Sequence, residues 1–163
     1  MRFILKKCMV VLVAGLVFAI GSIAFAGQAT TVDNFAYVLN TAFDNPSELI
    51  DNNLTEIGRQ RGIEFYRGNY KNVDVLLGVN GDGALICASL TVPDYRNFNG
   101  MYPLCRDRFG EPQIKNGPSN IASIVMDYEW KSQDSYMTLV SEKPSRYGWR
   151  DQVSFQLNPG YFN

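Results

Sequence analysis

The chain has 163 residues, of which 19% are charged, and its formal net charge is −1. It contains no histidine, so the commonest metal ligand and the commonest general base near neutral pH are both absent. A weakly acidic chain has no general electrostatic attraction to nucleic acid or to anionic lipid. The composition therefore argues against nucleic-acid binding and excludes catalysis by histidine. We expect no cofactor and no metal site.

Residues 1–26 predict a secretory signal peptide. Basic residues at positions 2, 6 and 7 precede an apolar run over 8–20, and Ala24-Phe25-Ala26 forms a small-residue cleavage site. The alternative is a retained membrane anchor, because the apolar segment is just long enough to span a bilayer. Cleavage after Ala26 predicts an exported protein, periplasmic or secreted, without membrane attachment, and a bacterial route is favoured over a eukaryotic one.

Cleavage would change both the charge and the cysteine count. It removes three of the 15 Lys and Arg residues and none of the 16 Asp and Glu residues, so the formal net charge becomes −4. It also removes Cys8 and leaves Cys87 and Cys105. In an oxidising compartment, such an even pair predicts one disulfide bond. The alternative is two buried thiols that never meet.

The mature chain is expected to begin with two helices. Residues 27–31 are interpreted as a mobile leader, and 32–163 have the size of one domain. Apolar residues at helical spacing predict a helix over 32–43. A capping asparagine followed by proline at the first helical position predicts a second helix over 46–53.

The apolar period then changes from that of a helix to that of a strand. The pattern predicts a strand over 62–70 and a β-hairpin over 73–90, the latter with an Asn-Gly-Asp-Gly turn. A third helix is expected to begin near 100–102, with Pro103 in its first turn, and to end at Gly110.

Three more strands follow a polar loop, over 121–131, 135–142 and 149–157. Short strands joined by tight turns indicate the α+β class, with an antiparallel β-sheet and helices packed on one face. The two halves of the chain share an order of helix followed by three strands. This order is similar to the architecture of small exported folds such as the β-lactamase inhibitory protein. That similarity covers no motif and implies no function.

The best candidate for a contact site is the boundary between a turn and the last strand. It contains Arg146, Tyr147, Trp149 and Arg150. Arginine and large aromatic residues are enriched at binding hot spots, although Trp149 could equally belong to the core. Together with export and the missing catalytic motifs, these residues predict a non-catalytic domain that binds a protein or a glycan in the cell envelope or outside the cell.

Two alternative functions stay open at this point. Asp127 and Glu129 share one face of a predicted strand and could serve a carboxylate-based hydrolase of the cell envelope. That function requires an enclosed pocket with both acids and a raised pKa for one of them. The other alternative is a structural or assembly factor that pairs with a partner through a free sheet edge, with 149–157 as the candidate strand.

Overall fold

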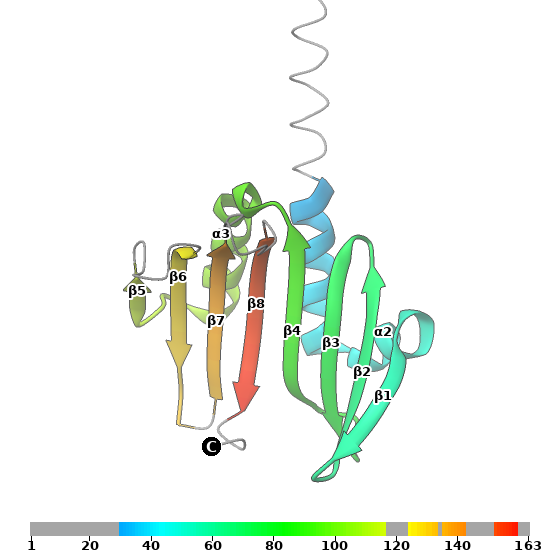
Figure 1. Cartoon of the computed structure of the whole chain (residues 1–163). Coiled ribbons are helices and arrows are strands. Elements are labelled where there is room, and N and C mark those ends of the chain that lie inside the picture. The colour runs from blue at the N-terminus through cyan, green and yellow to red at the C-terminus, as the bar shows by residue number, and fades with distance from the viewer. Residues whose placement is uncertain (1–29, 117–123, 134, 143–151, 160–163) are drawn as a thin grey trace, which may run out of the picture. The chain divides into compact units, whose positions relative to one another are not determined.

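The computed structural model of the chain describes residues 30–116, 124–133, 135–142 and 152–159. They form one antiparallel sheet of eight strands, and the helices lie against one of its faces (Figure 1). The predicted α+β class with an antiparallel sheet is therefore confirmed. Within these residues, no helix is both long enough and apolar enough to cross a membrane. The predicted signal peptide lies outside the described residues.

Most elements occupy the positions that the sequence predicts. The first helix covers residues 30–44, and it is followed by α2 (Pro46–Asn53), a short 3-10 helix η1 (Tyr95–Asn97) and α3 (Phe98–Phe109). The strands are β1 (Thr55–Gln60), β2 (Ile63–Tyr70), β3 (Val73–Asn80), β4 (Leu85–Pro93), β5 (Ile114–Asn116), β6 (Ile124–Lys131), β7 (Ser135–Glu142) and β8 (Gln152–Pro159). The second helix and the β3–β4 hairpin are thus confirmed.

The strands lie in the order β1-β2-β3-β4-β8-β7-β6-β5. The first four strands of the chain form one block and the last four form another, and the blocks meet where β4 pairs with β8. Each block contains four strands where three were predicted, because the sequence patterns missed β1 and β5. The similarity of the two halves stays a prediction.

The position of β8 corrects one expectation about function. This strand pairs with β4 on one side and with β7 on the other, so both of its edges are occupied. The prediction that strand 149–157 offers a free edge to a partner is therefore wrong. Among the strands that the structure describes, the outermost ones are β1 and β5.

The core lies between the sheet and the helices. Alternate residues of β3 and β8 point towards the helices, as period 2 requires. From β3 these are Val73, Val75 and Leu77, and from β8 they are Val153, Phe155 and Leu157. The first helix contributes Phe35, Val38, Leu39 and Ala42 at helical spacing. Packing of this stripe against the sheet explains why residues 30–44 are helical.

The third helix begins earlier than predicted. Phe98 and Met101 are buried against the core, so tertiary packing stabilises two more residues at the start of α3. Pro103 consequently lies inside the helix rather than in its first turn. Gly110 ends the helix as expected, with a positive φ of 81°, and its carbonyl oxygen accepts a hydrogen bond from Nε1 of Trp130 at 2.8 Å.

Arg108 joins α3 to the first helix. Its guanidinium donates hydrogen bonds to Oδ1 of Asp44 at 2.6 Å and to Oδ1 of Asn40 at 2.8 Å. The hydrogen bond from Arg108 holds the pKa of Asp44 below its ordinary value of 3.8. A lowered carboxyl pKa contributes stability that is present above the ordinary pKa and is lost as the pH falls through the lowered one.

The Arg108→Gln variant should move the pKa of Asp44 back up towards 3.8, because the neutral amide supplies no positive charge. An NMR titration of the carboxyl carbon measures this shift. Asp94, whose pKa is lowered by Arg96, serves as the control and should be unchanged. An unchanged Asp44 pKa would show that this ion pair does not form in solution.

The turn between β1 and β2 carries an unfavourable residue. Arg61 and Gly62 have φ values of 52° and 79°, and two consecutive positive φ values define the type I′ hairpin turn. Glycine suits this region, but arginine adopts it only at a cost in free energy. The neighbouring turn has Lys71 in the same conformation, with a φ of 53°, followed by Asn72, which tolerates it, with a φ of 62°.

The Arg61→Asn variant should raise the free energy of unfolding by about 0.5 kcal/mol, because Asn-Gly is the preferred pair of a type I′ turn. Urea denaturation of the purified protein measures the change. The same substitution at Arg67, an exposed position within β2, should give no gain. Stabilisation at both positions, or at neither, would contradict the assignment of the cost to the turn.

Candidate binding surface

The sheet has two unlike faces. One face packs on the helices, and we call the other one the open face. The strand register places Asn69, Asp74, Thr91 and Ser154 side by side across four neighbouring strands, β2, β3, β4 and β8. They belong to the open face, because their neighbours in sequence, such as Val73, Leu90 and Val153, lie in the core.

The two central strands present no charged residue on the open face. From β4 these positions are Cys87, Ser89, Thr91 and Pro93, and from β8 they are Gln152, Ser154, Gln156 and Asn158. Six of the eight carry a hydroxyl or an amide group, which both donates and accepts hydrogen bonds. The middle of the open face is therefore polar but uncharged.

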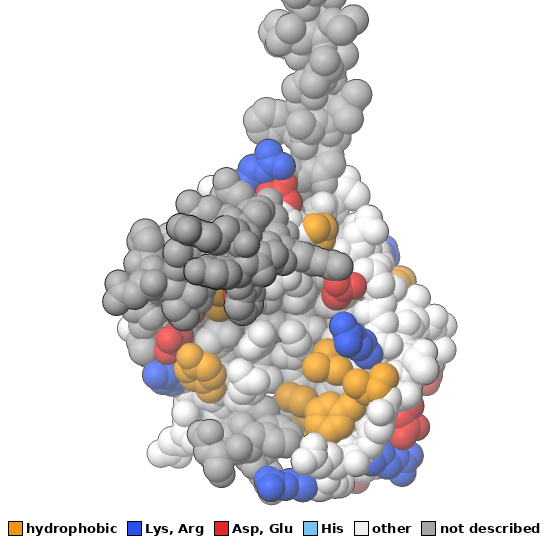
Figure 2. All heavy atoms as spheres, viewed as in Figure 1, with side chains coloured by type: hydrophobic (Ala, Val, Ile, Leu, Met, Phe, Trp, Pro, Cys, Tyr) orange, Lys and Arg blue, Asp and Glu red, His pale blue; other side chains and the backbone are white. Residues whose placement is uncertain are grey.

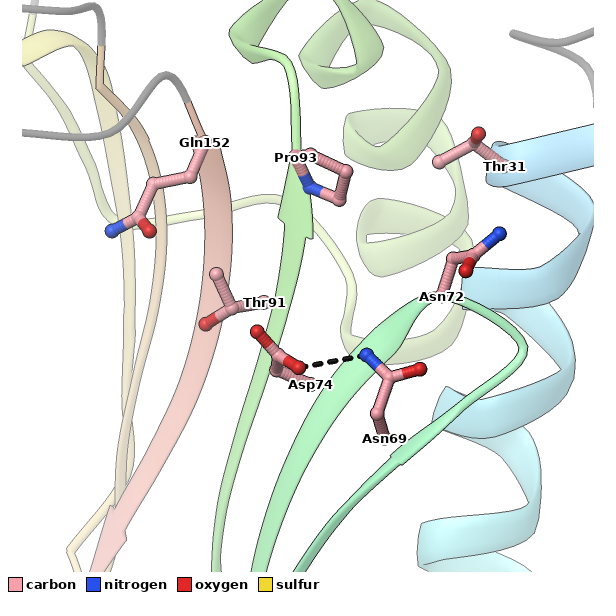
Figure 3. Close-up of a pocket in the computed structure, with 7 residues that line it drawn as sticks. All are labelled: Thr31, Asn69, Asn72, Asp74, Thr91, Pro93 and Gln152. Carbon is pink, nitrogen blue, oxygen red and sulfur yellow. Dashed lines mark hydrogen bonds between the residues drawn. The ribbon is translucent and has the colours of Figure 1, made fainter.

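A pocket of about 340 Å³ lies at one end of this face (Figure 3). Its lining residues come from the first helix, from the sheet and from the β2–β3 turn, and they are Thr31, Asn69, Asn72, Asp74, Thr91, Pro93 and Gln152. The side chains of Asn69, Asp74 and Thr91 lie side by side in Figure 3, as their register requires. The pocket thus combines amides, hydroxyls and a single carboxylate.

Hydrogen bonds hold several of these polar groups in place. Nδ2 of Asn69 donates to Oδ1 of Asp74 at 2.7 Å, which is the dashed line in Figure 3. Nε2 of Gln152 donates to Oε2 of Glu142 on β7 at 3.1 Å. The carboxylate of Asp74 and the carbonyl oxygen of Asn69 retain further capacity to accept hydrogen bonds from a ligand.

Apolar side chains gather on a second part of the open face, over β2 and β3 (Figure 2). The register places Ile63 and Phe65 of β2 and Leu76 of β3 on this side. Phe65 and Leu76 are half-buried, whereas Ile63 is buried. The open face therefore offers an apolar patch beside its uncharged polar centre, a combination that suits recognition.

The two acids of the hydrolase alternative also lie on the open face, on β6. The carboxylate of Glu129 pairs with Nζ of Lys131 at 3.2 Å. Burial and the charge of Glu129 together raise the pKa of Tyr136 on β7 to about 12. Neither Glu129 nor Asp127 lines the pocket described above, so that pocket gives the hydrolase alternative no support.

The structure shows no bond between Cys87 and Cys105, and the predicted disulfide stays a prediction. Both thiols are free. The strand register places Cys87 on the open face, whereas Cys105 belongs to the core on the other side of the sheet. Cys105 is fully buried in the core on α3, whereas Cys87 is half-buried on the open face beside Gly78. An even number of cysteines indicates a disulfide only where the two side chains lie on the same face of the sheet. The alternation along β4 turns Cys87 away from the helices.

Two free thiols should be found when the protein without residues 1–26 is unfolded and alkylated in the absence of reductant, as measured by intact mass. In the folded protein, Cys105 should resist labelling, because burial raises its pKa to about 12. Cys87, whose pKa is also raised by burial, should react slowly but measurably. A mass without two alkyl groups would support the predicted disulfide instead.

The candidate site from the sequence cannot be compared with this surface. Arg146, Tyr147, Trp149 and Arg150 lie outside the described residues, so that prediction stands untested. Sequence reasoning did not select the pocket residues, because they come from segments far apart in the chain. The alternating polar residues of β8, beginning at Gln152, were the one feature of the sequence that pointed towards this surface. Within the described ranges, no cluster of three acidic or cysteine side chains could hold a metal ion.

Comparisons with known proteins place this chain in no family. No protein-family model matches it, and no curated protein matches it. The crystal structure of a DUF4309 family protein (YjgB) from Bacillus subtilis subsp. subtilis str. 168 is similar with a TM-score of 0.30 and 10% sequence identity, over 72% of this chain and 74% of that chain. A likeness at this level establishes neither a shared fold nor a shared function.

Proposed function

We propose that this chain is an exported, non-catalytic binding domain that recognises a protein or a glycan of the cell envelope through the open face of its sheet. One observation carries the proposal. The centre of that face presents uncharged hydroxyl and amide groups next to a pocket, whereas the helices and the core use the opposite face. Export follows from the predicted signal peptide at residues 1–26.

The contact residues from the sequence belong to the same proposal. Trp149 and Arg150 lie three and two residues before Gln152 in the sequence, and Gln152 lines the pocket. Arg146 and Tyr147 stand only a few residues further back. The double variant Tyr147→Ala with Trp149→Ala should therefore weaken capture of the partner while the circular-dichroism spectrum stays unchanged.

Site-specific crosslinking tests the recognition surface directly. A photo-crosslinking amino acid at Gln156, an exposed position in the middle of the open face, should capture a partner from the native envelope. The same amino acid at Ser47, an exposed position on α2, is the matched control and should capture little. Equal capture from both positions, or capture from Ser47 alone, would place recognition away from the open face.

A further inference from the structure

We propose that the pocket at the end of the open face binds an uncharged saccharide. This inference deepens the proposed binding function and rests on it. The volume of the pocket, about 340 Å³, lies near the lower end of the volumes of small-molecule sites, which span roughly 300–1,000 Å³. The pocket can therefore hold a ligand of modest size. That size suits one or two sugar rings.

The charges of the lining argue against ionic ligands. Asp74 is the one charged residue among the lining side chains of the described chain, and no Lys or Arg lines the pocket. An anion would therefore lack a countercharge and would face a carboxylate. A cation would find Asp74, but one of its oxygens already accepts a hydrogen bond from Asn69.

The hydrogen-bonding groups match hydroxyls best. Asn69, Asn72 and Gln152 each offer a donor and an acceptor, and the hydroxyl of Thr91 does the same. A sugar hydroxyl also donates and accepts, so it can use both kinds of partner, whereas an ammonium group can only donate. An ammonium ligand could donate to the amide oxygens, but it would offer no acceptor to the amide N–H groups.

The strand pairing argues against an extended peptide as the ligand. Peptides that bind to sheets usually add a strand at a free edge and use backbone hydrogen bonds. The pocket lies instead on β2, β3, β4 and β8. The strands β3, β4 and β8 are paired on both sides, and β1 pairs with β2 only as far as Arg67. On β3, β4 and β8 recognition comes from side chains. The uncharged row continues along β8 to the exposed Gln156, beyond Ser154, which is buried.

An NMR titration tests the proposal on protein expressed from the complete sequence and purified after export. The probes are maltose, cellobiose and N,N′-diacetylchitobiose, compared with glucuronate and glucosamine as charged sugars. At least one neutral disaccharide should shift the side-chain amide signals of Asn69, Asn72 and Gln152 in a saturable way. Both charged sugars should bind about tenfold more weakly than that disaccharide.

Two variants with matched controls locate the binding. Thr91→Val removes a hydroxyl at nearly constant shape, and Asp74→Asn removes the charge. Each should weaken binding about three- to tenfold, as loss of one hydrogen bond predicts. Thr55→Val on β1 and Asp82→Asn in the β3–β4 turn are exposed controls outside the pocket and should change affinity less than about twofold.

The outcomes separate this inference from the proposed function. No shift with any of the three neutral disaccharides, equal binding of charged sugars, or equal losses in variants and controls would overturn the saccharide site. If crosslinking at Gln156 still captures a partner, the binding function stands without it. If that capture fails as well, both proposals fall.

Discussion

Replacing Phe155 with alanine should lower the free energy of unfolding by about 3–5 kcal/mol, the usual range for truncating a buried phenylalanine. Phe155 is fully buried on β8, in the middle of the sheet. Its ring stacks on Phe109 of α3 with centroids 5.5 Å apart and meets the edge of Phe43 of the first helix at 6.3 Å. The variant would therefore weaken the contact of both helices with the central strand.

Urea denaturation, followed by circular dichroism, measures this loss. The matched control is Gln156→Ala at the next position of β8, which is exposed on the open face and should change stability by less than about 0.5 kcal/mol. A Phe155→Ala variant as stable as that control would mean that the aromatic contacts between sheet and helices do not form as described.

The Gly68→Ala variant should destabilise the protein by about 1–3 kcal/mol, because the added methyl group has no room. A Cβ atom at Gly68 would lie 2.4 Å from the backbone oxygen of Asn53 and 3.0 Å from Cδ2 of Leu54. The end of α2 therefore packs directly on the backbone of β2. Since the nearest obstacle is backbone, either α2 or β2 must move to accept the side chain.

Gly81 in the β3–β4 turn provides the comparison. A Cβ atom there would meet nothing within 4 Å, and the residue has no positive φ. Gly81→Ala should therefore be neutral or slightly stabilising in the same denaturation assay, because alanine restricts the unfolded chain. If the two variants behave alike, the close approach of α2 to β2 is not present in solution.

The elements that could be predicted are those whose residues alternate between two environments. Residues 73–90 alternate because one side of the hairpin faces the core, and 46–53 carry local helix signals at their start. The strand β1 has no such pattern, because all six of its residues are exposed. Its polar sequence and its glycine resemble a loop, and only pairing with β2 makes it a strand.

The surface was harder to predict than the fold. Asn69, Asp74 and Thr91 become neighbours only through the register of three strands, and no local sequence pattern predicts that register. The cysteine pair shows the same difficulty, because the sequence does not show on which face of the sheet each cysteine lies. The cysteine count predicted a bond between Cys87 and Cys105, but it carried no information on the faces to which the pleat of β4 and the position of α3 assign the two residues.

The central pairing of β4 with β8 has a consequence for how the protein folds. Leu90 pairs with Phe155, so the two blocks of strands can join only after nearly the whole described chain is available. Contacts between such distant residues slow folding, since a long loop must close first. Until then, β4 is an unpaired edge that carries the apolar residues Ala88, Leu90 and Val92. An exposed edge of this kind favours aggregation. We therefore expect the partly folded chain to be prone to aggregation until β8 has paired with β4.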